Sequence, residues 1–152
     1  MMRSISSIVA IAIAIAGCAT SQTDTMRFVA VSGAPAAAGP YSQGVVANGL
    51  LFTAGFTPRD PITAKLVQGD IAIQATRVFD NLEAVLNGAG CTMKDVIKVT
   101  VYMTDLNDFA KMNEVMAAKF GDHKPARTTI QAARLPSGAA LEIDFVARLP
   151  HR

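Results

Sequence analysis

The stretch Pro125–Asp144, PARTTIQAARLPSGAALEID, decides how the C-terminal part of this 152-residue chain folds. It predicts two short strands that are joined by a turn at Pro136-Ser137-Gly138. In the second strand, apolar side chains at every other position alternate with Glu142 and Asp144, which is typical of a strand with one buried face. Arg127 opens the first strand, so we expect its guanidinium and a carboxylate of the second strand to meet on one face of the sheet.

An arginine and a carboxylate on one sheet face can bind a small carboxylic acid and act on it. The fork of Arg127 can hold a substrate carboxylate by two parallel hydrogen bonds. Glu142 can orient or deprotonate a water molecule. The same alternation also arises where a strand carries charges only because one face meets solvent. The pattern alone therefore leaves a structural interpretation open, including an ion pair of Arg127 with Glu142 or Asp144.

The rest of the chain alternates between strand and helix signals. Two strands flank Asn48-Gly49, a strong hairpin signal because both turn positions need positive φ. Asp70 is expected to cap a helix that Gly88 and Gly90 end, and Gly121 is expected to stop a second helix. The predicted elements are strands at 26–31, 45–47, 50–54 and 96–103, helices over 71–87 and from 107 or 108 onward, and the two C-terminal strands.

This order, β-β-β-α-β-α-β-β, predicts a single α+β domain over residues 26–150. Strand–helix–strand units favour right-handed crossovers, so both helices should cover the same face of the sheet. The other face then needs a cover, because apolar strand residues such as Leu51, Val99 and Val101 argue against a fully solvated face. We therefore expect that face to be buried in an oligomer.

Residues 1–25 have the features of an export signal followed by a linker. Arg3 supplies a positive start, and residues 5–16 are almost wholly apolar, a run too short to span a bilayer but typical of a secretory signal. The run ends in Ile15-Ala16-Gly17-Cys18, which resembles a bacterial lipobox. Residues 1–17 are thus predicted to be a lipoprotein-type signal peptide, with lipid on Cys18 and a flexible linker over 18–25.

This leader predicts that the protein is exported and is held on the membrane only by its lipid. In a Gram-negative bacterium it would face the periplasm. Ala19, rather than aspartate, after the cysteine indicates the outer membrane. The alternative is a chance apolar extension on a cytoplasmic protein. If Cys18 carries lipid, Cys91 has no partner within the chain, so no disulfide is expected. Cys91 is then interpreted as a small buried residue rather than a reactive thiol.

Composition and charge disfavour several other classes of protein. The chain has 14 Lys and Arg against 12 Asp and Glu, with no basic run and 6% aromatic residues, so no nucleic-acid surface is expected. His123 and His151 lie apart, and no cluster has metal-ligand spacing, so no metal is expected. The absence of GxGxxG, P-loop and GxSxG motifs gives no reason to expect a cofactor.

Several motifs follow one another in order over roughly residues 26–149: APAAAGPYSQG at 34–44, LFTAG at 51–55, VTVYMTDLNDF at 99–109, Asn113, PARTT at 125–129 and ARLPSGAALEID at 133–144. In this order they resemble the RidA family, which is also called the YjgF/YER057c/UK114 family. The resemblance implies a chorismate mutase-like mixed sheet and a homotrimer with a cleft between each pair of subunits. It also implies hydrolysis of reactive enamines and imines, such as 2-aminoacrylate, to a 2-keto acid and ammonia without a cofactor.

The resemblance also implies roles for individual residues. By position, Arg127 matches the arginine that binds the substrate carboxylate, and Glu142 matches the glutamate that handles water. Tyr41 and Asn113 match residues that line the cleft, and the backbone of Thr129 can contact the substrate nitrogen or carboxylate. As alternatives, Tyr41 could pack in the core with its hydroxyl satisfied by backbone, and Asn113 could serve only its own helix.

Three features depart from the pattern of many active relatives. Those relatives carry Thr-Ser-Gly-Gln where this chain has TAGF at 53–56, and cysteine where it has Thr129. Ala54 and Phe56 therefore alter the expected substrate-binding wall, and a larger or more apolar imino acid is expected if Phe56 points into the cleft. The leader is the third departure, because an exported enzyme would not meet 2-aminoacrylate made in the cytosol.

A rival function comes from the same resemblance. Some family members resemble non-catalytic trimers that bind small metabolites or act as holdase-like chaperones. A ribonuclease activity attributed to other relatives is disfavoured here, because the charge is near neutral and no basic stripe is present.

Overall fold

The computed structural model of this protein describes residues 26–150, which form one six-stranded sheet and two α-helices in the predicted order. The predicted signal peptide over 1–17, the lipidation site Cys18 and the linker over 18–25 lie outside the described residues. The elements are β1 (Arg27–Val29), β2 (Gly44–Ala47), β3 (Leu50–Thr53), α1 (Ile71–Ala89), β4 (Val96–Met103), α2 (Phe109–Phe120), β5 (Ala126–Gln131) and β6 (Leu141–Arg148).

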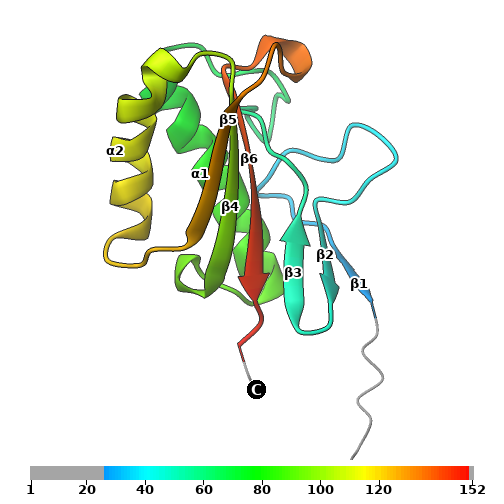
Figure 1. The fold of residues 1–152 in the computed structure, drawn as a ribbon. Coiled ribbons are helices and arrows are strands. Elements are labelled where there is room, and N and C mark those ends of the chain that lie inside the picture. Colours follow the sequence, from blue (N-terminus) through cyan, green and yellow to red (C-terminus); the bar gives the residue numbers. More distant parts are fainter. Residues whose placement is uncertain (1–25, 151–152) are drawn as a thin grey trace, which may run out of the picture.

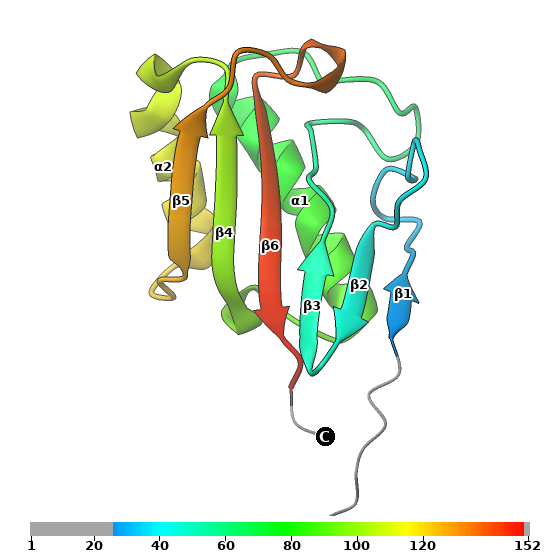
Figure 2. The same ribbon diagram turned by 45° about the vertical axis from the view of Figure 1, so that its right-hand side comes forward.

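The strands lie in the order β1-β2-β3-β6-β4-β5, as Figures 1 and 2 show. Only β4 and β5 are parallel, and α2 connects them; every other neighbouring pair is antiparallel. Asn48 and Gly49 have φ of 50° and 71°, so the predicted hairpin turn between β2 and β3 is confirmed. The two C-terminal strands are not neighbours, because β4 lies between them.

Both helices lie on one face of the sheet (Figures 1 and 2), as predicted. Between this face and the helices lies the core, in which Phe79 of α1, Phe120 of α2 and Phe145 of β6 have ring centroids 5.8–6.1 Å apart. Full burial of each such side chain stabilises the fold by about 1.5–3 kcal/mol. Within residues 26–150, no helix has the length and apolar character needed to cross a membrane.

The ends of the helices differ from the prediction in one respect. Gly88 does not end α1, which continues to Ala89 and ends at Gly90, whose φ is 86°. A Cβ at Gly88 would overlap Cγ1 of Val31, so this glycine instead lets α1 pack closely against the segment after β1. Gly121 follows the last residue of α2, as predicted.

The second face of the sheet is open in the single chain (Figure 2). The residues on which we based the expected oligomer, Leu51, Val99 and Val101, are fully buried on the helix face, so that part of the reasoning was wrong. The strand registers place other apolar residues on the open face: Phe28, Phe52 and Ile130 are 66%, 45% and 46% exposed. The expectation of an oligomer therefore remains, on these residues, and the homotrimer remains a prediction.

Candidate functional site

A cavity of about 500 Å³, here called the Glu142 pocket, opens on the described part of the chain. Its walls are the loop between β1 and β2, the segment after β3, and the turn before β6 with the start of β6. The ionisable side chains in its wall are Tyr41, Arg59 and Glu142. Of the predicted site residues, the structure therefore brings Tyr41, Ala54, Phe56 and Glu142 together.

Glu142 is the acid–base group of this pocket. It is half-buried on β6, and burial, with a smaller contribution from the charge of Asp144, raises the pKa of its carboxyl above the ordinary 4.5. The backbone of Gly55 lies directly against this side chain, because a Cβ at Gly55 would overlap Oε1 of Glu142. The missing side chain at Gly55 thus leaves the space that the carboxylate occupies.

Gln43 holds the opposite wall in place, a role that the sequence analysis did not assign. Its side chain is 4% exposed, accepts from the N–H of Val31 at 2.6 Å, and donates to the carbonyls of Val31, Ala34 and Pro35 at 2.8–3.1 Å. A buried amide that makes all these bonds fixes the loop that it joins. The only signal in the sequence was its place in the PYSQG motif, just before β2.

Tyr41 lies at the surface of the pocket and not in the core. It is 53% exposed, and its hydroxyl accepts a hydrogen bond from the N–H of Ala38 at 3.1 Å. The alternative of core packing is therefore wrong, although a backbone group does bind the hydroxyl, as that alternative supposed.

The two substitutions in the TAGF segment have different consequences. Ala54 is part of the pocket wall, and its N–H donates to the carbonyl of Gln43 at 2.9 Å. Phe56 borders the pocket but is only 6% exposed, because its backbone pairs with Ile143 and its side chain belongs to the core. Phe56 therefore presents little of its side chain to the cavity, and the structure gives no support to the expectation of a bulkier substrate.

Arg127 lies in a second group of residues, here called the Arg127 cluster, with Phe109, Asn113 and Met116 of α2. Nη1 of Arg127 donates to Oδ1 of Asn113 and to the sulfur of Met116, and the guanidinium carbon is 5.1 Å from the centroid of the Phe109 ring. Asn113 therefore does more than serve its own helix, since it orients the arginine. Arg127 itself remains exposed at the edge strand β5.

Thr129 follows two residues after Arg127 on the same face of β5. Its register partner on β4 is the buried Val101, and its hydroxyl is buried without a hydrogen-bond partner among the described residues. The hydroxyl points away from solvent, so any ligand contact would come from the backbone of this edge strand, as the resemblance implied.

The expected meeting of Arg127 and Glu142 on one sheet face is wrong within one chain. On β4, Arg127 is opposite Val99 and Glu142 is opposite Tyr102. Val99 and Tyr102 are three positions apart, and successive residues of a strand point to opposite faces. Arg127 therefore lies on the helix face and Glu142 on the open face, which also excludes an ion pair between them in one chain.

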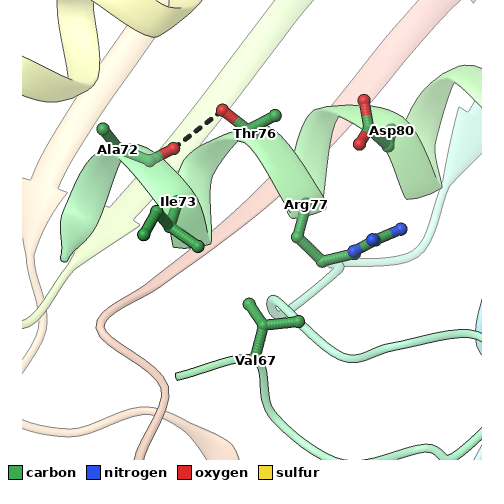
Figure 3. Close-up of a pocket in the computed structure, with 6 residues that line it drawn as sticks. All are labelled: Val67, Ala72, Ile73, Thr76, Arg77 and Asp80. Atoms are coloured by element: carbon green, nitrogen blue, oxygen red, sulfur yellow. Dashed lines mark hydrogen bonds between the residues drawn. The ribbon is translucent and has the colours of Figure 1, made fainter. Parts of the chain in front are cut away.

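A second, shallower cavity of about 350 Å³ runs along α1, and Figure 3 shows the residues that line it. Two of its polar groups are engaged elsewhere: the hydroxyl of Thr76 donates to the carbonyl of Ala72, and Asp80 forms an ion pair of 2.6 Å with Lys119. Arg77 also lines the cavity, and its buried Nε has no hydrogen-bond partner among the described residues. The one carboxylate among these lining residues is already paired with Lys119, so this groove is the weaker candidate for acid–base chemistry.

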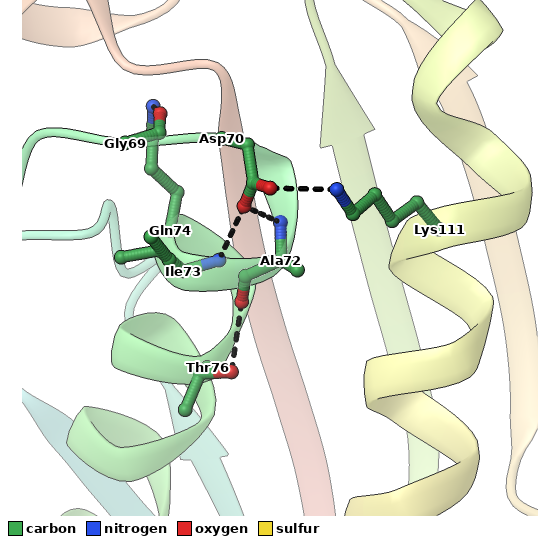
Figure 4. A network of polar contacts seen from close by, with 7 residues as sticks. All are labelled: Gly69, Asp70, Ala72, Ile73, Gln74, Thr76 and Lys111. Atoms are coloured by element: carbon green, nitrogen blue, oxygen red, sulfur yellow. Dashed lines mark hydrogen bonds and ion pairs between the residues drawn. The ribbon is translucent and has the colours of Figure 1, made fainter.

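The N-terminus of α1 is also occupied by the chain's own groups (Figure 4). Oδ1 of Asp70 accepts from the N–H groups of Ala72 and Ile73 at 3.0 and 3.1 Å, and Oδ2 pairs with Lys111 of α2 at 2.6 Å. The predicted cap is confirmed, and its carboxylate fills the position that an anionic ligand would take at a helix N-terminus.

The remaining chemistry-bearing residues give no further site. Cys91 is buried, and burial raises the pKa of its thiol, as expected of an unreactive cysteine. A ring nitrogen of His123 lies 2.6 Å from the carbonyl of Val96. Across residues 26–150, no group of three or more His, Cys, Asp or Glu side chains could hold a metal ion.

Comparison with known proteins places this chain among similar sequences and folds. The family model described as Endoribonuclease L-PSP matches residues 31–149. The RutC family protein PH0854 of Pyrococcus horikoshii is 51% identical over 114 residues, 75% of this chain and 90% of that protein. The 2-iminobutanoate/2-iminopropanoate deaminase of Escherichia coli K12 is 41% identical over 124 residues, 80% of this chain and 96% of that enzyme.

Solved structures share the fold. The crystal structure of E. coli TdcF with bound serine matches with a TM-score of 0.78 at 39% identity, and the match covers 82% of this chain and 99% of that one. The residues matched by the family model include both the Glu142 pocket and the Arg127 cluster.

Proposed function

This chain belongs to the RidA (YjgF/YER057c/UK114) family, and we propose that it hydrolyses 2-imino acids and their enamine tautomers to 2-keto acids and ammonia. Relatives named as imine deaminases support a deaminase of this general type. We further propose that Arg127 binds the substrate carboxylate and that Glu142 activates the water, in a cleft between two subunits of a homotrimer.

The observation that carries this proposal is the separation of the two half-sites. The Glu142 pocket holds an acid–base group but no Arg127, and the Arg127 cluster holds an oriented cation but no acid–base group. Because the two lie on opposite faces of the sheet, a site containing both needs a second copy of the chain. Closed symmetry of identical subunits repeats such a junction at every interface.

The chemistry needs neither a covalent nucleophile nor a metal. The carbon of a protonated imine is already electrophilic, so the site must hold the carboxylate, place a water and move protons. Arg127, with Asn113 orienting it, binds the carboxylate through charge-assisted hydrogen bonds worth about 1.5–3 kcal/mol each. Fixing the two reactants in this way supplies much of the acceleration.

Glu142 then serves as base and proton carrier. Its carboxylate takes a proton from water as the water oxygen bonds to the imine carbon, which gives a tetrahedral carbinolamine. Glu142 passes this proton to the nitrogen, the carbon–nitrogen bond breaks, and ammonia leaves while the remaining hydroxyl gives its proton back to the carboxylate of Glu142 and becomes the keto oxygen. Tyr41 borders the same pocket.

The direct test is release of keto acid from 2-imino acids generated in situ by an amino-acid oxidase, using protein from Ala19 onward. We expect the protein to accelerate this release and Arg127→Ala to abolish the acceleration while the oligomer persists. Normal turnover by Arg127→Ala would remove the role assigned to this arginine. A folded oligomer that accelerates no imine would favour the rival, a non-catalytic trimer that binds metabolites or holds unfolded proteins.

We also propose that residues 1–17 direct export and that Cys18 carries the lipid anchor. The charged start, the apolar run and the Gly17-Cys18 junction support this reading. In a bacterial host that makes the full chain, the protein should fractionate with membranes and incorporate labelled fatty acid, and Cys18→Ser should abolish both. Unlabelled protein of full length in the cytoplasm would instead support the cytoplasmic alternative.

A further inference from the structure

Arg59 is a charged group in the Glu142 pocket that the proposed mechanism does not use. Among the described residues that line this pocket it is the one cation, and Glu142 is the one carboxylate. Arg59 lies in the segment after β3, in the loop that leads to α1. The sequence pattern gave no reason to single it out.

The backbone of Arg59 is fixed on both sides. Its carbonyl accepts a hydrogen bond of 2.8 Å from Nδ2 of Asn81, a fully buried residue of α1. Its N–H donates to the carbonyl of Thr57 at 2.7 Å, and the residue pairs with Leu66 across the loop. These contacts hold the start of the side chain rigidly beside the pocket.

The guanidinium is held at one nitrogen and free at the others. Nε donates to the carbonyl of Ala64 at 2.7 Å, which orients the planar fork along the loop. Among residues 26–150, no acceptor or carboxylate pairs with its two terminal nitrogens. A planar fork with two free nitrogens matches the geometry of a carboxylate.

The nearby carboxylates do not neutralise this cation. Asp60 directs Oδ1 to the N–H groups of Ile62 and Thr63 and to the hydroxyl of Thr63. Oε1 of Glu142 lies against the backbone of Gly55, and none of the ion pairs among the described residues joins Glu142 to Arg59. A positive group and an acid–base group therefore occupy separate parts of one cavity.

We propose that Arg59 binds a second, distal carboxylate, so that this site prefers 2-imino dicarboxylic acids over monocarboxylic ones. The inference rests on the proposed function for the identity of the reacting group. The α-carboxylate would bind Arg127 of the neighbouring subunit, the imine carbon would lie by Glu142, and the side-chain carboxylate would reach Arg59. A cavity of about 500 Å³ leaves room beyond a three-carbon imino acid, since pockets of roughly 300–1,000 Å³ hold drug-sized ligands.

The experiment compares acids of equal carbon number that differ in the distal charge. Amino-acid oxidases generate 2-iminoglutarate from glutamate and 2-iminopentanoate from norvaline, and kcat/KM for each is measured with wild type and Arg59→Leu. Lys65→Leu is the matched control, because it removes the same charge from an exposed position of the same loop, outside the pocket. Equilibrium binding of 2-oxoglutarate and 2-oxopentanoate to the same proteins gives a readout that needs no turnover.

We expect Arg59→Leu to lower the ratio of kcat/KM for the dicarboxylate to kcat/KM for the monocarboxylate by about 10- to 150-fold. This is the effect expected from the loss of one charge-assisted hydrogen bond. Lys65→Leu should leave the ratio as in wild type. An unchanged ratio in Arg59→Leu would overturn the proposal. An equal loss with both substrates would also overturn it, because Arg59 would then bind the α-carboxylate or only support the fold.

The binding measurement separates failure of this inference from failure of the proposed function. If no imine is turned over, the deaminase proposal fails. The role of Arg59 is then still decided by the binding measurement, which shows whether wild type prefers 2-oxoglutarate over 2-oxopentanoate and whether Arg59→Leu loses that preference. If Arg59→Leu does not fold, Arg59→Gln keeps an N–H donor for the carbonyl of Ala64 while it removes the charge. The same loss of selectivity is expected from that variant, and retained selectivity would refute the proposal.

Discussion

Mixing two inactive variants should restore activity if each active site takes Arg127 from one subunit and Glu142 from another. Arg127→Ala removes the carboxylate-binding cation and leaves the Glu142 pocket intact. Glu142→Gln removes the base and leaves the Arg127 cluster intact. Each variant alone should lose about 100-fold or more in kcat/KM, since two charge-assisted hydrogen bonds of about 1.5–3 kcal/mol each are absent in the first, and the base is absent in the second.

The size of the rescue follows from the separation of the two half-sites. In a mixed oligomer assembled from equal amounts of both variants, a site is complete only when its arginine comes from the Glu142→Gln chain and its glutamate from the Arg127→Ala chain. Random assortment makes each condition true half of the time, so about one quarter of the sites should be complete. The mixture should then show about one quarter of wild-type activity per site.

The assay is co-refolding of the two variants at equal concentration, followed by measurement of keto-acid release from an imine generated in situ. Each variant refolded alone, and wild type refolded with the double variant Arg127→Ala/Glu142→Gln, are the controls. The second control should also give about one quarter of complete sites, because both contributing chains must be wild type. If this control recovers activity and the mixed single variants stay at background, both residues act within one chain, and the inter-subunit site is refuted.

Four further results are expected. Gly55→Ala should nearly abolish turnover with little change in thermal unfolding, because the new Cβ overlaps the movable end of Glu142 and not the core; normal turnover would show that Glu142 need not occupy this position. The pKa of Glu142 is raised by burial, and only its ionised form acts as base, so the acid limb of the profile of kcat/KM against pH should lie above pH 4.5. Because its pKa is raised in the folded state, Glu142 binds a proton more tightly there than in the unfolded state, so the free energy of unfolding falls as pH rises through this pKa. Glutamine cannot ionise, so Glu142→Gln should raise the unfolding temperature at neutral pH but not below pH 4.5. Gln43→Ala should lower the free energy of unfolding by about 1–3 kcal/mol, because buried groups that Gln43 now satisfies lose their partner, as denaturant titration would measure.

The candidate site was predictable from the sequence only in part. The motifs pointed to Arg127, Glu142, Tyr41 and Asn113, and the structure places each of them in one of two half-sites. The direction of Phe56 was not predictable, because it depends on the backbone pairing of this residue with Ile143, far along the chain.

What the sequence by itself determined about this protein is its local structure. The alternation in β6, the Asn48-Gly49 turn and the Asp70 cap are each specified by neighbouring residues, and the structure contains all three. These features depend on backbone preferences and periodicity that act over a few positions.

What only the tertiary structure decided is which strands are neighbours and therefore which side chains share a face. β6 pairs with β3 on one side and β4 on the other, so β4 separates Arg127 from Glu142 although the turn at Pro136–Gly138 joins their strands. Strand order results from packing the whole sheet against α1 and α2, and a side chain's face follows from its register in that sheet. That register separates the two half-sites, and the path of the loop after β3 brings Arg59 to the same pocket as Glu142.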